Sequence, residues 1–311
     1  MPDIIITEFM DTNAVQETAK NYDIHYDPQL VDKPDDLKAL LAHARGLVVR
    51  NRTRVDVELL NAAPRLKVVG RLGVGLDNID LKACEERHVT VCPATGANDA
   101  AVAEWVIATV MILLRGAFLS RAQMQNGAWP RTQAMGHETA GKTLGLVGFG
   151  QIARFTARIA QSLGINVIAF DPYVSPNDQC WSGITRMEEL FDLLRKADIV
   201  SLHVPLTDST RHLLDDEAIA QMKDGAIVVN AARGGVLDEN ALVAAMKSGH
   251  IKGAALDVYE TEPLTSSSAA KFADLSNLVL TPHIAGVTIE SNQRVSQVTM
   301  ANVRRVLEAA K

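Results

Sequence analysis

Short apolar runs alternate with longer amphipathic stretches along the whole chain. In the first third the apolar runs are DIIITEF, GLVVRN, LKVVGR and VTVCP, and segments with helical spacing separate them. A parallel strand that is covered on both faces is almost entirely apolar, whereas the helix that connects two such strands repeats every 3.6 residues. The pattern therefore predicts a first set of parallel strands joined by crossover helices.

A second series of apolar runs begins near residue 143. It comprises TLGLVGF, NVIAFDP, ADIVSLHVP, AIVVNAA, GAALDVY and LVLTPHI, again with helical segments between them. This series predicts a second doubly wound sheet. Because 311 residues exceed the usual size of one domain, we expect two domains. The fold class is thus α/β, with two Rossmann-like or flavodoxin-like domains on parallel sheets.

Three stretches stand outside this alternation. Residues 99–116 are apolar with an acidic start and predict a long helix. The polar stretch 120–142 follows without periodicity and is too long for a plain connection, so we expect an arm that packs on another subunit. Residues 288–311 predict one amphipathic helix.

Composition and charge narrow the class of protein. A net charge of −6 disfavours a nucleic-acid groove, because such a surface concentrates Lys and Arg. The longest uncharged apolar run, 105–114, is too short to span a bilayer, and the acidic start MPDIIITEFMD lacks the basic segment of a secretory signal. The three cysteines form no CxxC pair, and no metal-ligand spacing is present. We expect a cytoplasmic protein without nucleic-acid, membrane or metal partners.

The stretch TLGLVGFGQIAR has the spacing of a dinucleotide-binding turn. Gly148 and Gly150 directly follow a predicted strand, and Ala153 takes the third small position. The first glycine permits the tight turn, the second lets backbone approach a pyrophosphate, and the third allows close helix–strand packing. Taken alone, the glycines also fit a purely structural turn. The next strand ends in Asp171, whose carboxylate would accept ribose hydroxyls and repel a 2′-phosphate, so the combination predicts NAD rather than NADP.

Three later motifs each place a polar residue just past a predicted strand. VVNAARGGVLDE contains Arg233, LDVYETEPL contains Glu262 and LTPHIAG contains His283. Open α/β sheets bind ligands at this end of their strands. Arginine can hold a carboxylate, histidine can exchange a hydroxyl proton as hydride moves, and glutamate can orient the histidine. Singly, these residues also fit a surface ion pair, a turn and a backbone cap; together they predict 2-hydroxy acid oxidation.

These motifs, with GRLGVGLDNID and LHVPLT, resemble the NAD-dependent D-2-hydroxyacid dehydrogenase family, near its phosphoglycerate dehydrogenase branch. The resemblance covers nearly the whole chain. It implies a discontinuous substrate-binding domain, 1–98 plus 286–311, and an NAD-binding domain, 99–285, with the active site in the cleft between them. It also implies a homodimer formed through the helix and arm of residues 99–140. We expect no serine feedback, because the sequence holds no counterpart of the regulatory domain that many phosphoglycerate dehydrogenases append.

The resemblance also assigns roles to individual positions. The catalytic residues implied are Arg233, Glu262 and His283. The NAD contacts implied are Gly148, Gly150, Gln151 and Ile152 at the pyrophosphate, Asp171 at the ribose, His203, Val204 and Pro205 at the adenine side, and Ala231 and Asp257 towards nicotinamide. The backbone N–H groups of Val74 and Gly75 would bind the substrate carboxylate.

The basic cluster VRNRTRVD bears on the substrate. It places Arg50, Arg52 and Arg54 after a predicted strand, and Arg71 lies at the end of the next one. In an extended segment alternate side chains point to one side, so the three charges would need an anion or an acidic partner. A solvated basic loop is one interpretation. The sharper hypothesis is that Arg50, Arg52 and Arg71 recognise a phosphate or sulfonate on substrate C3.

Within the family, ITEFMD, VRNRTRVD, PATGAN, MGHE and TPHIAGVTIESN are most similar to the branch that oxidises (S)-3-sulfolactate to 3-sulfopyruvate. The choice of sulfonate rests on this resemblance, because sulfonate and phosphate are both tetrahedral oxyanions. 3-Phosphoglycerate and glyoxylate or hydroxypyruvate are alternative substrates, and an NAD(H)-sensing binding protein is the alternative from another class. Arg131 and His137 of the arm are candidates to enter a neighbouring subunit's site.

Overall fold

The computed structural model describes residues 1–309 and divides into two compact units. Unit 1 contains residues 1–98 together with the chain from Val287 onwards, and unit 2 contains residues 99–286. Gly286 therefore groups with unit 2, whereas the predicted boundary placed it in the other domain. Residues 310 and 311, which belong to the predicted substrate-binding domain, lie outside the described residues.

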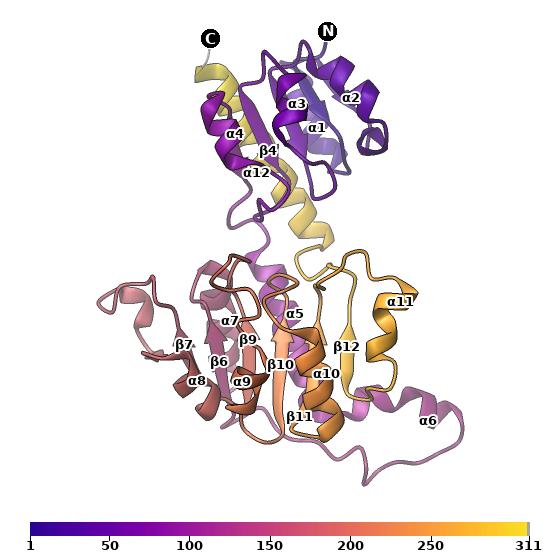
Figure 1. Ribbon diagram of the computed structural model, residues 1–311, viewed down its shortest axis with the longest axis vertical. Coiled ribbons are helices and arrows are strands. Elements are labelled where there is room, and N and C mark those ends of the chain that lie inside the picture. Colours follow the sequence, from indigo (N-terminus) through magenta and orange to yellow (C-terminus); the bar gives the residue numbers. More distant parts are fainter. Residues whose placement is uncertain (310–311) are drawn as a thin grey trace. The chain divides into compact units, whose positions relative to one another are not determined.

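Unit 1 is built on a five-stranded parallel sheet with the order β2-β1-β3-β4-β5. Figure 1 labels β4 of this sheet and the helices around it. The strands are β1 (Ile4–Ile6), β2 (Ile24–Tyr26), β3 (Gly46–Val49), β4 (Val68–Arg71) and β5 (Thr90–Pro93). Four of them correspond to predicted apolar runs. β2 was not predicted, because all its residues are partly exposed at the sheet edge and the segment lacks a continuous apolar signal.

Helices cover both faces of this sheet. One apolar cluster joins α2, α3 and α4 to one face, and a second joins α1 and α12 to the other. The helices are α1 (Thr12–Thr18), η1 (Leu30–Asp32), α2 (Pro34–Leu41), α3 (Val57–Asn61), α4 (Leu81–Glu86) and α12 (Ile289–Ala309). The last helix of the described chain thus completes the core of a sheet formed by the first hundred residues.

Unit 2 is built on a seven-stranded parallel sheet with the order β12-β11-β10-β9-β6-β7-β8 (Figure 1). The strands are β6 (Thr143–Val147), β7 (Asn166–Phe170), β8 (Thr185–Arg186), β9 (Ile199–Leu202), β10 (Ala226–Asn230), β11 (Ile251–Leu256) and β12 (Leu278–Leu280). From β6 the chain adds β7 and β8 on one side of the sheet and then returns to add β9 to β12 on the other side. Dinucleotide-binding folds have such a reversal of strand order. Only β8, a two-residue edge strand, was not predicted.

The helices of unit 2 also form two layers. α5 and α7 pack against one face, and α8, α9 and α10 against the other. They are α5 (Asp99–Arg115), η2 (Ala117–Ser120), α6 (Arg121–Gln125), α7 (Gln151–Ser162), η3 (Gln179–Trp181), α8 (Leu190–Lys196), α9 (Asp216–Ala220), α10 (Glu239–Ser248), α11 (Ser266–Ala269) and η4 (Ala270–Phe272). The predicted α/β class with two doubly wound parallel sheets is confirmed.

The long apolar helix α5 belongs to the core of unit 2. Among the described residues no single helix is long and apolar enough to cross a membrane. Residues 99–115 and 117–125 meet the length and composition of a span only as a pair bent by 70°. Nine residues of α5 are buried, and six of them belong to the apolar cluster that α5 shares with the sheet and α7.

Candidate active site

Two glycines shape the turn between β6 and α7. Gly148 has a φ of +89°, and a Cβ there would lie 2.7 Å from the carbonyl oxygen of His203. Gly150 precedes α7, and a Cβ there would meet no described atom within 4 Å. Among the described residues no side chain caps the first turn of α7, so its N–H groups and the space beside Gly150 fit a pyrophosphate.

Asp171 lies directly after β7 and beside this turn. Its Oδ2 accepts the Phe149 N–H at 2.8 Å, and its Oδ1 accepts the Tyr173 N–H at 2.9 Å. The two hydrogen bonds fix the carboxylate next to the glycine turn. Each carboxylate oxygen has two lone pairs, so capacity remains for the hydroxyls of a ribose.

The segment after β9 lies on the other side of the turn. The N–H of His203 donates to the Val147 carbonyl at 2.8 Å, and a ring nitrogen of His203 lies 2.9 Å from Ser201 Oγ. Burial lowers the pKa of His203 to about 4, so its imidazole is neutral at pH 7. The structure places His203 and Val204, two of the predicted adenine-side residues, beside Gly148, and Pro205 follows them in the chain.

Arg233 is carried by the loop that follows β10. Asn230, which is 2% exposed, braces this loop: its Nδ2 donates to the Arg233 carbonyl and its Oδ1 accepts a backbone N–H, both at 3.0 Å. A Cβ on Gly234 would lie 1.7 Å from the Tyr259 carbonyl oxygen. Only glycine therefore lets this loop, which also contains Ala231, pass against the loop that follows β11.

Glu262 and His283 are in direct contact. Glu262 Oε2 lies 2.8 Å from His283 Nδ1, and Oε1 accepts the Tyr259 N–H at 3.0 Å. Partial burial acts to raise the pKa of Glu262, but the hydrogen bonds from His283 and Tyr259 and the nearby charge of Arg233 lower it. The carboxylate thus stays ionised and holds the imidazole, whose side chain is 43% exposed. The structure brings all three predicted catalytic residues together in unit 2.

Asp257 holds the loop that carries His283. It is 1% exposed, and its carboxylate accepts the N–H groups of Ile284 and Ala285 at 2.8 Å and the Thr281 hydroxyl at 2.5 Å. Its carbonyl accepts the His283 N–H at 2.8 Å. His283 has a φ of +53°, which a non-glycine residue adopts only at an energetic cost, and these bonds hold it there. Asp257 is predicted at the nicotinamide, and the structure shows in addition that it positions His283.

The predicted carboxylate-binding backbone lies in unit 1, after β4. Val74 is 37% exposed, and Gly75 follows it in the same loop. Arg71, at the end of β4, folds back over Gly73 and donates from Nη1 to the Leu72 carbonyl at 2.6 Å. The Arg71 guanidinium therefore lies against Leu72 and Gly73, at the start of the loop that contains Val74.

A buried acid that the motifs did not single out shapes the basic loop after β3. Glu8 is 4% exposed and accepts the N–H groups of residues 50–53 at 2.9 to 3.3 Å. Burial acts to raise the pKa of Glu8, but these donors outweigh it and lower the pKa. The loop backbone consequently curls around an ionised carboxylate. Glu8 is more than forty positions away in the sequence, so no local pattern could have revealed this contact.

The arginines of this loop do not share one side. Arg50 donates to Asn292 Oδ1 at 3.0 Å, whereas Arg52 forms an ion pair with Asp32. Arg54 is exposed. We expected an extended segment to point Arg50, Arg52 and Arg54 to one side, but Arg50 and Arg52 reach different partners because the backbone bends around Glu8. The acidic partner that the repelling charges required is supplied within unit 1 itself.

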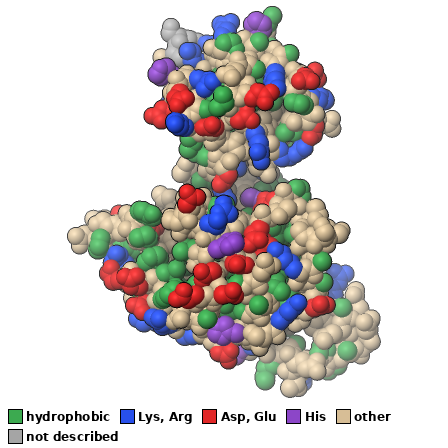
Figure 2. Space-filling view, viewed as in Figure 1, with side chains coloured by type: hydrophobic (Ala, Val, Ile, Leu, Met, Phe, Trp, Pro, Cys, Tyr) green, Lys and Arg blue, Asp and Glu red, His purple; other side chains and the backbone are tan. Residues whose placement is uncertain are grey.

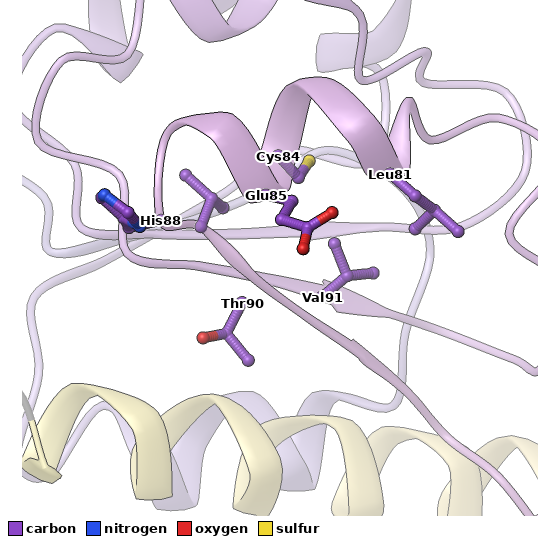
Figure 3. A pocket seen from close by; sticks show the side chains of 7 residues that line it. Leu81, Cys84, Glu85, His88, Thr90 and Val91 are labelled. Atoms are coloured by element: carbon purple, nitrogen blue, oxygen red, sulfur yellow. The ribbon is translucent and has the colours of Figure 1, made fainter.

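Unit 1 also contains an open hollow of 440 Å³ (Figure 3). Its lining comes from α4 and the start of β5: Leu81, Cys84, Glu85, His88, Val89, Thr90 and Val91. Thr90 and Val91 of the lining begin β5, whereas the predicted substrate residues lie at or just after the C-terminal ends of β3 and β4. No predicted site residue lines the hollow.

The parallel sheet of unit 2, its glycine turn and its Arg–Glu–His loops define the class of dinucleotide-dependent α/β dehydrogenases. The family model for the D-isomer specific 2-hydroxyacid dehydrogenase, NAD binding domain, matches residues 107–285. The chain belongs to this family and is an NAD-dependent 2-hydroxyacid oxidoreductase.

Individual relatives are similar over the full chain. The (S)-sulfolactate dehydrogenase of Chromohalobacter salexigens is 53% identical over 99% of both chains. The D-3-phosphoglycerate dehydrogenase of Mycobacterium leprae is 40% identical over 99% of this chain and 57% of its own length. Among solved structures, the D-lactate dehydrogenase from Aquifex aeolicus complexed with NAD and lactic acid has a TM-score of 0.85 at 27% identity, covering 98% of this chain and 96% of that one.

Proposed function

We propose that this enzyme oxidises (S)-3-sulfolactate to 3-sulfopyruvate with NAD. The observation that carries the proposal is the 53% identity, over 99% of both chains, to an enzyme named for that substrate. The basic loop of unit 1 supports it, because a sulfonate on C3 adds a second anionic group to the substrate. The 40% identity to a D-3-phosphoglycerate dehydrogenase makes 3-phosphoglycerate the second candidate.

We propose a step for each catalytic residue, and the geometry of unit 2 supports these steps. Arg233 binds the substrate carboxylate and polarises the oxygen on C2. His283 Nε2 takes the hydroxyl proton, and Glu262 stabilises the imidazolium that forms. NAD, when bound, accepts the hydride from C2. One alcohol and NAD thus become one ketone, NADH and a proton, and the reverse reaction uses the same groups.

We propose unit 2 as the NAD-binding domain and unit 1 as the source of further substrate contacts. The NAD contacts would be Gly148, Gly150, Gln151, Ile152, Asp171, His203, Val204, Pro205, Ala231 and Asp257. In unit 1, the N–H groups of Val74 and Gly75 would bind the carboxylate, and Arg50, Arg52 and Arg71 would bind the C3 anion. Arg52 reaches that anion by leaving its exposed ion pair with Asp32, which costs little because both side chains are 57% exposed.

A substrate panel tests the proposal. NADH formation is measured with (S)-3-sulfolactate, D-3-phosphoglycerate and D-glycerate side by side, and the highest kcat/KM is expected for sulfolactate. A preference for phosphoglycerate would support the second candidate. Tight NADH binding without turnover of any of the three would support a sensing protein instead.

Two variants test the anion site. We expect Arg52→Ala to raise KM for sulfolactate about 10- to 100-fold, the loss of one charged hydrogen bond, and to change KM for D-glycerate little. Asp32→Asn is the matched control, since it frees Arg52 and should leave KM for sulfolactate unchanged or lower it. Equal losses on both substrates with Arg52→Ala would contradict the assignment.

We also propose that the enzyme is a homodimer that pairs through the arm. The arm exposes the large apolar side chains of Trp129 at 77% and Met135 at 77%, and Phe118 just before it is 69% exposed. Burying such side chains in a second copy is favourable. Trp129→Ser with Met135→Ser should yield monomers in light scattering after gel filtration.

Two arm residues are proposed to enter the neighbouring subunit's site. Arg131 lies in the exposed arm, and a ring nitrogen of His137 lies 3.1 Å from Lys252 Nζ. Mixing an Arg131→Ala His137→Ala variant with a His283→Gln variant should restore activity through mixed dimers. For location we propose the cytoplasm, where the free thiols of the three cysteines would stay reduced.

A further inference from the structure

A cluster of charged side chains in unit 2 has no part in the steps above. It comprises Glu239, Glu260, Lys271, His212 and Asp238. Figure 2 shows acidic side chains together with Lys, Arg and His side chains on the face of unit 2 that carries α9 and α10. The cluster joins the start of α10, the loop after β11 and η4, and that same loop carries Glu262.

Glu239 is the buried member of the cluster. Its side chain is 5% exposed, its Oε1 accepts the Glu260 N–H at 2.7 Å, and its Oε2 lies 2.5 Å from Lys271 Nζ. In return, Glu260 Oε1 accepts the Glu239 N–H at 3.2 Å. Reciprocal hydrogen bonds therefore tie the start of α10 to the loop after β11.

The surrounding charges explain how a buried carboxylate is accommodated. Lys271 compensates Glu239 directly and lies 3.9 Å from Glu260 Oε2. On the outer side, His212 Nε2 lies 3.3 Å from Glu260 Oε1, and His212 Nδ1 lies 3.7 Å from Asp238 Oδ2. Removing one partner of a buried ion pair leaves the other uncompensated, which is costly. A change at Glu239 would therefore act on Lys271 and on the loop that both residues hold.

This loop reaches the catalytic pair through one residue. Glu260 follows Tyr259, which is 6% exposed and donates its N–H to Glu262 at 3.0 Å. The Tyr259 hydroxyl donates to the Thr281 carbonyl at 2.8 Å, at the base of the loop that carries His283. The hydrogen bond from the Glu260 N–H to Glu239 therefore also holds the preceding residue, Tyr259, whose N–H orients Glu262.

We propose that Glu239 is a positioning residue for catalysis. With Lys271, its buried carboxylate holds the loop after β11 so that Glu262 stays aligned with His283. The inference rests on the catalytic roles proposed above for Glu262 and His283. The glycine turn lies on other elements, β6 and α7, so a change at Glu239 should affect the chemical step and spare NADH binding.

The test compares Glu239→Gln with wild type in kcat, KM, NADH affinity, melting temperature and the pH profile of kcat/KM. We expect kcat to fall about 10- to 100-fold, as for a misaligned catalytic group, with NADH affinity unchanged. The pKa of the catalytic base in the profile should fall, because a displaced Glu262 stabilises the imidazolium less. Lys271→Gln removes the other partner of the same ion pair. It should likewise lower kcat and the pKa of the catalytic base in the profile.

Asp198→Asn is the matched control. Asp198 accepts the Thr143 N–H at 2.8 Å and lies 3.0 Å from Lys223 Nζ, so it makes the same kinds of contact as Glu239. It precedes β9 and therefore lies at the N-terminal end of the parallel strands, whereas the catalytic loops follow their C-terminal ends. We expect Asp198→Asn to lower the melting temperature without changing kcat or the pH profile.

Two results would overturn the inference, and they are distinguishable. If Glu239→Gln and Lys271→Gln behave like Asp198→Asn, while Glu262→Gln loses activity, the catalytic roles stand and the positioning role of Glu239 is wrong. If Glu262→Gln itself keeps wild-type kcat and pH profile, the catalytic role of Glu262 fails and the inference fails with it.

Discussion

The imidazole Nδ1 of His283 lies 2.8 Å from Glu262 Oε2, although the two residues are 21 positions apart and belong to different loops. An ionised carboxylate accepts the proton on Nδ1, so the neutral ring carries its lone pair on Nε2. One contact therefore sets the orientation of the ring, its tautomer and the nitrogen that exchanges a proton with substrate.

Replacing that imidazole should remove proton exchange and spare cofactor binding. We expect His283→Gln to lower kcat about 10²- to 10⁴-fold, the usual contribution of a general base. NADH affinity, measured by fluorescence titration, should stay within about twofold, since His283 lies outside the glycine turn. A variant that turns over at the wild-type rate would exclude His283 as the catalytic base.

The two glycines of the β6–α7 turn should respond differently to alanine. Gly148→Ala adds a Cβ 2.7 Å from the His203 carbonyl at a φ of +89°, so we expect it to lower the free energy of unfolding by about 2 kcal/mol or more. Gly150→Ala adds a Cβ in open space at a φ of −73°, so the fold should tolerate it.

Gly150→Ala should weaken NAD binding instead of lowering the stability of the fold. Its methyl group would occupy the space beside the α7 N-terminus, and we expect KM for NAD to rise about tenfold or more while the melting temperature stays unchanged. Urea unfolding and steady-state kinetics on both variants check the pair. If a folded Gly150→Ala variant has an unchanged KM for NAD, the pyrophosphate does not bind beside Gly150.

Asp171 should decide between the two nicotinamide cofactors. Asp171→Asn keeps one oxygen to accept a backbone N–H and removes the charge that repels a 2′-phosphate. We expect the ratio of kcat/KM with NADP to that with NAD to rise about tenfold or more. Both cofactors are assayed with the same substrate at saturation. A constant ratio would show that another group excludes the 2′-phosphate.

His203 should make the fold sensitive to mild acid. Its pKa is lowered from 6.5 to about 4 in the folded protein, so between these values the unfolded chain binds more protons. Above pH 6.5 the imidazole is neutral in the folded and the unfolded chain, so this group does not lower the free energy of unfolding. As the pH falls towards 4, protonation of the unfolded chain lowers the free energy of unfolding by at most about 3 kcal/mol. His203→Gln should flatten the dependence of unfolding free energy on pH between 7 and 5. The exposed His43→Gln is the control and should not change it.

The sequence was sufficient to predict most of the fold because the central strands are apolar on both faces. Strands such as β3 and β9 are fully buried, and their runs of Leu, Val and Ile are visible without any tertiary information. The edge strands β2 and β8 carry no such signal. Their residues are half-exposed or too few, so pairing with one neighbour alone stabilises them.

Site residues that directly follow a strand could be predicted from the sequence. Residues that support the site from distant parts of the chain could not. Arg233, Glu262 and His283 each follow an apolar run, and the structure gathers them. Glu8 and Glu239 act through backbone groups far away in the sequence. Both lie in quoted motifs, ITEFMD and VVNAARGGVLDE, but nothing in either motif shows which backbone groups the carboxylate binds. The geometry of the basic loop was mispredicted for that reason, since periodicity cannot register a carboxylate from another element.

The packing of α12 against the first sheet has a consequence for synthesis on the ribosome. Val303 and Leu307 are fully buried against β1, β3 and β4, so the part of that sheet face that α1 does not cover stays exposed until α12 emerges. The central segment, with its own core, can fold as soon as residue 286 is free. We therefore expect the nascent chain to acquire protease resistance first in its middle, and the early segment to depend on chaperones until α12 has emerged.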